Sequence, residues 1–339
     1  MLNTLKNKVV ASLKFRYFLF CRNFYKISSR IIYFLKITKN EKFAENYGLY
    51  KKIYVDGLND MTNCQKFIIP MWQAMAENIQ KDFMNNFNIS FLENEIIRRT
   101  MFLDYGGSTL QKMEIKYLES ACTGERLKYL LKESEVGHPT ITYFKYLTSH
   151  NSIHQLHHLV NFSQKTGLDY ANISQVVEWG GGYGCLSRIL IKINPNLTYI
   201  IIDLPIFSTI QAVYLSTIFG AEKINFITKK NLIIAKHKIN IIPINMLVNI
   251  GDKILNTDIF ISTWALSEST NFSQKFVEAA DFFGAKYLLM AHQQKSRDVQ
   301  YAEDITNHLK NYQTIYHEKI PNLKNNYYLF CKINNGQKS

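Results

Sequence analysis

Residues 176–184 read Val-Val-Glu-Trp-Gly-Gly-Gly-Tyr-Gly, and this stretch decides the fold. An apolar run, Val176–Trp179, predicts a strand that leads directly into glycines at 180, 182 and 184. Glycine adopts backbone conformations that other residues avoid, so the chain can turn sharply here and approach a ligand closely. The next segment, Cys185–Ile193, has the pattern of a helix, whose first N–H groups are left without intrahelical partners. We therefore predict a strand, a glycine turn and a helix, in that order.

An acidic residue completes this unit. Asp203 lies nineteen residues after Gly184 and ends the next apolar run, Thr198–Ile202. A carboxylate at the end of the second strand can accept hydrogen bonds from both hydroxyls of a ribose. The two strands, the turn and the acid together predict a nucleoside-binding site at the carboxyl end of a parallel sheet.

The rest of the C-terminal half repeats the alternation of apolar runs and helical stretches. Further strands are expected at Ile239–Ile244, Asp258–Thr263 and Lys286–Ala291, and further helices at Phe207–Phe219, Phe272–Phe283 and Val299–Asn311. Continuous apolar strands separated by helices indicate an α/β fold with a parallel sheet buried on both faces. Two last runs, Gln313–Tyr316 and Tyr327–Ile333, have no helix between them and predict an antiparallel closing pair. That makes seven strands with helices on both faces.

The N-terminal half has a different organisation. Its patterns are helical: Met71, Trp72, Met75, Ile79 and Phe83 recur at helix spacing after Pro70, and four further segments look helical, namely 90–102, 108–120, 140–149 and 152–166. We expect three parts: a basic aromatic arm at 1–40, a helical region at 41–169 that covers the acceptor side, and the sheet domain at 170–335.

The arm accounts for most of the net charge of +13. The first forty residues hold nine Lys and Arg and no acid, so the remaining chain carries only +4. We therefore expect no nucleic-acid partner. The arm can lie on an anionic membrane through residues 1–39, or pack on its own domain or on a second subunit as a homodimer. Its apolar runs are too short for a membrane span, and because no long apolar segment with a small-residue cleavage site follows the charges, we expect no secretory signal. The five cysteines are scattered and show no C-x-x-C spacing, which is typical of a protein of the reducing cytoplasm. We therefore expect a cytoplasmic protein, which the arm could bring to the inner face of the membrane.

The glycine spacing favours one cofactor class. A dinucleotide fingerprint requires G-x-G-x-x-G/A, but Cys185 or Ser187 occupies its last position, and the bulky Tyr183 would crowd a pyrophosphate. The pattern present, Glu178-x-Gly-x-Gly-x-Gly, resembles motif I of class I S-adenosylmethionine-dependent methyltransferases, which have a Rossmann-like fold. A nicotinamide-dependent oxidoreductase and a catalytically inactive interaction protein remain as alternatives.

The resemblance extends along the chain from 176 to 292. Asp203-Leu204-Pro205 is similar to the acid-Leu-Pro of small-molecule O-methyltransferases, in which the acid holds the ribose. Asn245-Met246 stands where that group carries Asp-Met near the adenine. The chain as a whole resembles bacterial sugar O-methyltransferases of surface-polysaccharide gene clusters. The resemblance implies S-adenosylmethionine as cofactor, a sugar or glycan as acceptor, and a set of cofactor contacts: Glu178, Gly180, Gly182, Tyr183, Gly184, Asp203, Leu204, Asn245, Met246, Thr263 and Trp264. A non-sugar small molecule is the alternative acceptor.

Two residues are candidates for the general base that a sugar hydroxyl needs. Glu268 follows the fourth strand and could act itself, orient a histidine, or merely lie in the first turn of a helix capped by a serine. His292 ends the fifth strand, where a histidine could titrate near neutral pH or be a polar strand end without a role.

Other histidines are weaker candidates. His138 and His150 lie in turns and could contact the acceptor. Helical spacing joins His154, His157 and His158, as in some metal sites, but no acid accompanies them at H-E-x-x-H spacing, so a solvated or core-edge helix face is expected. We predict no metal site, although the sequence does not exclude a divalent ion as cofactor.

Overall fold

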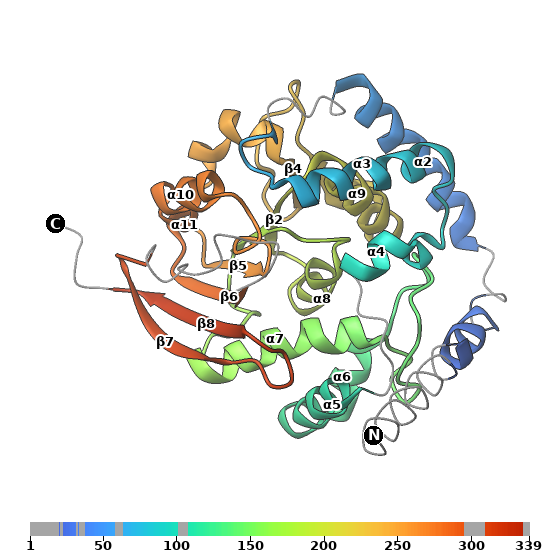
Figure 1. Cartoon of the computed structure of the whole chain (residues 1–339), viewed down its shortest axis with the longest axis horizontal. Helices are drawn as coiled ribbons and strands as arrows, with labels where there is room; N and C mark the ends of the chain where they lie inside the picture. Colours follow the sequence, from blue (N-terminus) through green and yellow to red (C-terminus); the bar gives the residue numbers. More distant parts are fainter. Residues whose placement is uncertain are drawn as a thin grey trace, which may run out of the picture. The chain divides into compact units, whose positions relative to one another are not determined.

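The computed structural model describes residues 20, 23–31, 33, 38–57, 64–100, 108–294 and 309–334. The strand before the glycine turn lies in an eight-stranded sheet (Figure 1). The strand order is β3-β4-β2-β1-β5-β6-β8-β7. The central strands are β1 (Gln175–Trp179), β2 (Thr198–Asp203), β4 (Ile239–Pro243), β5 (Ile259–Thr263) and β6 (Tyr287–Gln293), and all of them run parallel.

The sheet confirms the α/β class and the predicted ending. β7 (Tyr312–Lys319) and β8 (Asn326–Ile333) are antiparallel, and β8 pairs with β6. The seven expected strands are present, and a short edge strand that the sequence did not predict, β3 (Ile224–Phe226), is added beside β4. Every residue of β2 and β4 is buried, as expected for parallel strands covered on both faces.

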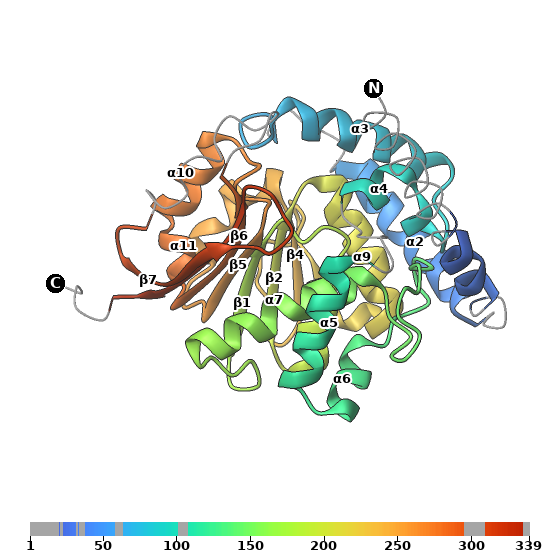
Figure 2. The ribbon, with the colours of Figure 1, turned by 60° about the horizontal axis from the view of Figure 1, so that its bottom comes forward.

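Helices cover both faces of the sheet (Figure 2). On one face, Phe162 of α7 (His150–Thr166) packs edge-on against Phe330 of β8. On the other face, Phe282 of α11 (Asp281–Gly284), which follows α10 (Asn271–Ala279), packs against Phe260 of β5. The helices α8 (Cys185–Ile193) and α9 (Pro205–Phe219) follow β1 and β2. Because these strands are parallel, their carboxyl ends lie on the same side of the sheet. The loops after β1, β2, β4, β5 and β6 therefore all lie on that side.

The helices α2 (Thr38–Gly57) and α3 (Pro70–Asn85) pack with the sheet domain. Tyr50 contacts Phe226, Asn46 donates a hydrogen bond to Thr217 of α9, and Trp72 packs edge-on against Phe207. The chain accordingly divides into two compact units, 1–40 with 89–157, and 41–88 with 158–339. This differs from the expected division at residue 170, because α2 and α3 use their apolar faces against α9 and the edge strand.

The other unit contains η2 (Phe91–Glu93), α4 (Glu95–Thr100), α5 (Thr109–Ala121), α6 (Gly124–Leu131) and the first half of α7. Residues 23–31 are also helical. The helix expected at 140–149 is absent: the segment forms a turn in which Tyr143 bridges Thr148, with Leu147 at a positive φ of 49°. Most of the predicted arm and most of the predicted helix Val299–Asn311 lie outside the described residues.

Among the described residues, no helix combines the length and the apolar character that crossing a membrane requires.

Candidate active site

The glycine turn has the backbone geometry that its sequence predicts. Gly180, Gly182 and Gly184 have φ angles of +79°, +58° and +98°, a region that other residues rarely adopt. A Cβ atom on Gly180 would lie 2.0 Å from the Cβ of Ala265, and one on Gly181 would lie 2.6 Å from Ile201. The turn therefore requires glycine both for its conformation and for the close approach of β2 and of the loop after β5.

Asp203 fixes this turn as well as ending β2. Its carboxylate accepts hydrogen bonds from the backbone N–H of Leu204 at 2.7 Å and of Gly182 at 3.1 Å. Gln211 of α9 donates to the same carboxylate at 2.8 Å and to the carbonyl of Gly182 at 2.9 Å. Burial raises the pKa of Asp203 to about 7, although these hydrogen bonds oppose the shift. Asp203 and the turn are thus one hydrogen-bonded assembly.

Glu178 is the second buried acid of this assembly. It is 2% exposed, and Tyr199 of β2 donates a hydrogen bond to its Oε2 at 2.9 Å. Burial raises the pKa of Glu178 to about 8, Tyr199 opposes this, and the nearby Asp203 adds to it. Two neighbouring buried carboxyls with raised pKa values form a site that favours a cation, because a positive ligand stabilises their ionised forms.

The Tyr183 side chain is placed differently from our expectation. Its ring is buried and packs edge-on against Tyr214 of α9 at 5.1 Å. The ring therefore does not project from the turn toward a ligand, and the expected crowding of a pyrophosphate by Tyr183 is not observed. What disfavours a dinucleotide is instead the negative charge of Glu178 and Asp203, which would repel its pyrophosphate.

An unpaired acceptor follows β4. Asn245 and Met246 lie in η4 (Ile244–Asn249), and both side chains are buried. The Oδ1 atom of Asn245 is buried without a hydrogen-bond partner. A buried acceptor left unpaired is costly, so a ligand with an N–H donor would be favoured here. The amino group of an adenine is such a donor.

The loop after β5 is tightly held. Trp264 has a positive φ of 66°, its backbone N–H donates to the carbonyl of Ala291 on β6, and its indole donates to Asn326 of β8. Thr263, the last residue of β5, is only partly buried. Ala265 follows and is the residue against which Gly180 packs. The loop after β5 therefore lies directly against the glycine turn.

Glu268, in the same loop, has the environment of an acid–base residue. Gln293, at the end of β6, donates a hydrogen bond to its Oε1 at 3.1 Å, and the indole of Trp72 on α3 donates another. Burial raises the pKa of Glu268 to about 7, against the lowering effect of Trp72. The alternative of a first-turn acid in a serine-capped helix is wrong, because α10 begins at Asn271 and its cap is Thr270, which accepts a hydrogen bond from Ser273.

His292 does not join Glu268. Successive side chains of a strand point to opposite faces, so His292 and Gln293 face away from each other. His292 is buried, and its ring stacks on those of His317 and Tyr327, with centroid separations of 5.6 and 5.8 Å. Burial, and then His317, lower its pKa to about 4. The idea that Glu268 orients a histidine is therefore wrong for His292; its partners are an amide and an indole.

The remaining candidate histidines belong to the other unit. His138 stacks on Tyr33 and shares a hydrogen bond with Ser90, and burial lowers its pKa. His150 lies buried 3.5 Å from the carboxylate of Glu114. Their contact with an acceptor stays a prediction.

Glu114 of α5 also explains the cluster on α7. Nδ1 of His154 lies 2.5 Å from one oxygen of Glu114, and Nδ1 of His157 lies 4.0 Å from it, so both histidines are grouped around this buried carboxylate. His158 instead pairs with Tyr328 in the sheet unit. Within the part of the chain that the structure describes, no group of three or more His, Cys, Asp and Glu is arranged to hold a metal ion.

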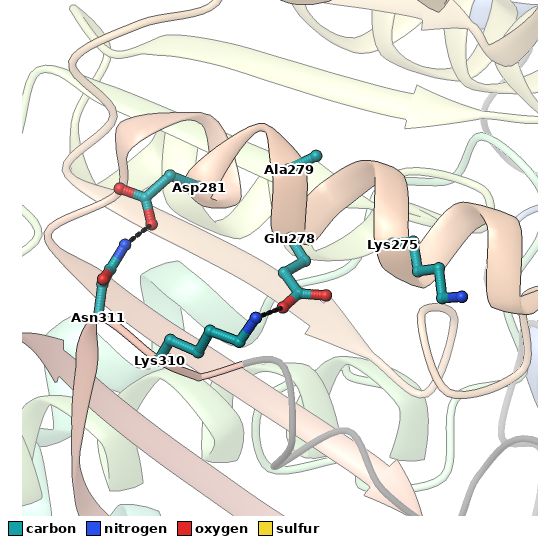
Figure 3. Close-up of a pocket in the computed structure, with 6 residues that line it drawn as sticks. All are labelled: Lys275, Glu278, Ala279, Asp281, Lys310 and Asn311. Carbon is teal, nitrogen blue, oxygen red and sulfur yellow. Dashed lines mark hydrogen bonds and ion pairs between the residues drawn. The ribbon is translucent and has the colours of Figure 1, made fainter.

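A surface pocket of about 410 Å³ lies elsewhere in the sheet unit (Figure 3). Lys275, Glu278 and Asp281 of α10 and α11 line it, together with Lys310 and Asn311. Glu278 pairs with Lys310, and Asn311 with Asp281. None of the residues of the glycine turn or of the Glu268 surroundings lines it, and we assign it no role.

Three residues of the site escaped the sequence argument: Gln211, Trp72 and Gln293. Gln211 left a signal, because it is a single amide in the middle of the otherwise apolar and hydroxyl-bearing helix α9. No sequence pattern indicates Trp72 or Gln293, since they contact Glu268 only in the folded chain.

No protein-family profile matches the chain, and no curated protein matches it in sequence. Similar solved structures include two methyltransferases and a fibrillarin. The mitomycin 7-O-methyltransferase MmcR is 10% identical over 78% of this chain and 69% of that one, with a TM-score of 0.38. The magnesium protoporphyrin IX methyltransferase of Synechocystis PCC 6803, solved with bound SAM, is 12% identical over 67% and 98%, with a TM-score of 0.37. Fibrillarin of Aeropyrum pernix, solved with S-adenosyl-L-methionine, is 9% identical over 51% and 74%, with a TM-score of 0.35. At these values, the functional argument rests on the residues of this chain.

Proposed function

We propose that the chain is an S-adenosylmethionine-dependent O-methyltransferase whose acceptor is a sugar hydroxyl, as in the assembly of surface polysaccharides. The observation that carries the cofactor is the buried acid pair Glu178 and Asp203 beside a glycine turn with positive φ angles. S-adenosylmethionine carries a sulfonium and an ammonium, whereas a nicotinamide dinucleotide would bring a negative pyrophosphate to the same turn. The charge therefore supports the methyl donor over the dinucleotide.

Each part of this cofactor has a residue suited to it. Glu178 and the glycine turn suit the methionine part, Asp203 suits the ribose hydroxyls, and the unpaired Oδ1 of Asn245 suits the adenine amino group. The bound cofactor would supply an activated methyl group, so the protein needs to align the acceptor and remove its proton.

Glu268 is the residue that we propose for proton removal. A carboxylate whose pKa is raised to about 7 is a stronger base than an ordinary one and is still half ionised at neutral pH. The hydrogen bonds from Gln293 and Trp72 hold one carboxylate in place and leave it able to accept another proton. His292, with its pKa lowered to about 4, is a weaker base.

The sugar as acceptor rests on the likeness of the chain to bacterial sugar O-methyltransferases, and the experiment separates it from the cofactor. Calorimetry with S-adenosylmethionine, S-adenosylhomocysteine and NAD⁺ tests the cofactor first; binding of NAD⁺ alone would contradict the proposal. Methyl transfer is then measured on free sugars, nucleotide sugars and polysaccharide fragments, with phenolic and carboxylic small molecules as the other arm. Methyl transfer only to the phenolic or carboxylic small molecules would support the methyltransferase activity and would exclude a sugar as the acceptor.

Two matched variants test the base. Glu268→Gln should reduce kcat by about 10²–10⁴-fold, with little change in the Kd of the cofactor. Glu278→Gln, in α10, removes a carboxylate that pairs with Lys310 outside this site and should leave kcat unchanged (Figure 3). Equal rates for wild type and Glu268→Gln would exclude Glu268 as the base.

A further inference from the structure

The helix at residues 23–31 packs inward through a side formed by tyrosine and serine. Ser29 is buried and accepts a hydrogen bond from the backbone N–H of Ile141 at 2.8 Å, and Tyr33, one turn further on, donates to the carbonyl of Pro139 at 2.8 Å. Tyr25, one turn earlier, contacts Phe144. These residues recur at a spacing of four and hold one side of the segment against its own unit.

The opposite side of the segment is apolar and exposed. Phe20, Phe24, Ile27 and Ile31 recur at spacings of four, three and four, which places them on one helix face. Their exposed fractions are 69%, 53%, 59% and 65%. Phe144 and Leu147, in the turn that Phe24 contacts, are each 41% exposed. We call the four helical residues the outer apolar stripe.

This arrangement reverses the usual one, in which an amphipathic helix buries its apolar face against the core. Burial of the stripe in a further partner would remove this exposed apolar surface from water. The question is therefore which partner has the matching size and charge.

The part of the sequence that contains the stripe is strongly basic. The first forty residues hold nine basic side chains and no acidic one. Lys26 and Arg30 flank the stripe and share a single carboxylate, Glu93, so this flank keeps a net positive charge. An aromatic and aliphatic face with basic flanks is the pattern of a helix that lies in the interface of an anionic membrane.

The area of the stripe argues against a second copy of the chain as the partner. Aromatic side chains bury roughly 150–250 Å² each, so four side chains that are a little over half exposed present on the order of 400 Å². A stable protein interface buries about 800 Å² on each partner. A membrane surface sets no such minimum, because basic residues add electrostatic attraction to the insertion of a few apolar groups.

We propose that the outer apolar stripe docks this protein onto a membrane surface that contains anionic lipid. The stripe inserts its Phe and Ile side chains at the level of the headgroups, and Lys26 and Arg30, which flank it, contact the lipid phosphates.

The test is co-sedimentation of the full chain with vesicles. Wild type should bind vesicles of phosphatidylcholine with about one third phosphatidylglycerol, bind pure phosphatidylcholine much less, and lose binding as salt is raised. The double variant Ile27→Ser, Ile31→Ser should bind the anionic vesicles at least tenfold more weakly. Because both side chains are exposed, circular dichroism should show an unchanged fold.

The matched control replaces two equally exposed apolar residues of the other unit. Ile233 and Leu255 are 71% and 60% exposed, and the double variant Ile233→Ser, Leu255→Ser should bind vesicles like wild type. The proposal is overturned if wild type stays in the supernatant with anionic vesicles, or if Ile27→Ser, Ile31→Ser binds as well as the control. It is equally overturned if light scattering shows a wild-type dimer that only Ile27→Ser, Ile31→Ser converts to a monomer, since the stripe would then be a contact between copies.

Discussion

Replacement of Gly180 by alanine tests the glycine turn, and Gly167 provides its control. Both glycines have similar positive φ angles, +79° at Gly180 and +73° at Gly167. An added Cβ at Gly180 would lie 2.0 Å from the Cβ of Ala265, whereas at Gly167 it would meet nothing within 4 Å. The pair therefore separates the cost of the backbone conformation from the cost of the close approach.

The magnitudes follow from these two contributions. A left-handed conformation costs a residue with a Cβ roughly 1–2 kcal/mol, and both variants incur it. Overpacking adds typically 1–3 kcal/mol, and only Gly180→Ala incurs it. Gly167→Ala should therefore lower the free energy of unfolding by about 1–2 kcal/mol, and Gly180→Ala by about 2–5 kcal/mol.

The assay combines urea unfolding with calorimetry of S-adenosylmethionine binding. Because relief of the clash moves the loop after β5 away from the turn, Gly180→Ala should also weaken cofactor binding at least tenfold, while Gly167→Ala should not change it. Equal destabilisation by both variants, together with wild-type affinity in Gly180→Ala, would refute the assignment of this turn to the cofactor.

Four further predictions concern the buried acids, the unpaired amide and a histidine beside a buried acid. Affinity for S-adenosylmethionine should rise as the pH increases from 6 to 8, because the pKa values of Asp203 and Glu178 are raised to about 7 and 8 and the cation prefers their ionised forms. Calorimetry that showed a flat or falling affinity would contradict this. Asn245→Leu should weaken cofactor binding by about tenfold through the loss of one hydrogen bond, whereas the exposed Asn249→Leu should have no effect; equal affinities in a thermal-shift titration would remove Asn245 from the site. Glu114→Gln should destabilise the fold by about 3 kcal/mol, against at most about 1 kcal/mol for the exposed Glu119→Gln, as measured by urea unfolding at pH 7. The wild type should also lose stability as the pH falls from about 6.5 toward 4, because burial lowers the pKa of His157 to about 4 and the unfolded chain then binds more protons; a constant unfolding free energy over that window would argue against the buried cluster.

The parts of the fold that the sequence predicted depend on local pattern. The five central strands and α8 are largely apolar runs around a glycine turn, and their bounds agree with the structure within two residues, whereas β7 extends three residues beyond its expected end. The segment 140–149 failed because apolar residues at helical spacing also occur in a turn, and here Tyr143 pairs with Thr148 across that turn. β3 is three residues long and carries too short a pattern to be recognised.

The residues of the candidate site could be proposed from the sequence only where they follow or end a strand. Gly180, Asp203 and Asn245 stand at strand ends, where position along the chain fixes position in space. The partners of Glu268 were not predictable, because Trp72 comes from a helix almost two hundred residues earlier and Gln293 was passed over for its neighbour His292. The alternation of side chains along β6 decides between these neighbours, and the sequence does not show which face the loop after β5 approaches.

The acid pair links the order of the turn to the charge of the ligand. Asp203 accepts a hydrogen bond from the N–H of Gly182, so its protonation weakens the turn and also removes one negative charge from the site. Glu178 is buried behind the same turn, and the shift of its pKa to about 8 corresponds to an ionisation cost of several kcal/mol. A cation bound at the turn offsets that cost, and an anion increases it. The preference for a positively charged cofactor therefore follows from where the two carboxyls are buried, and the turn is best ordered in the ionisation state that binds that cofactor.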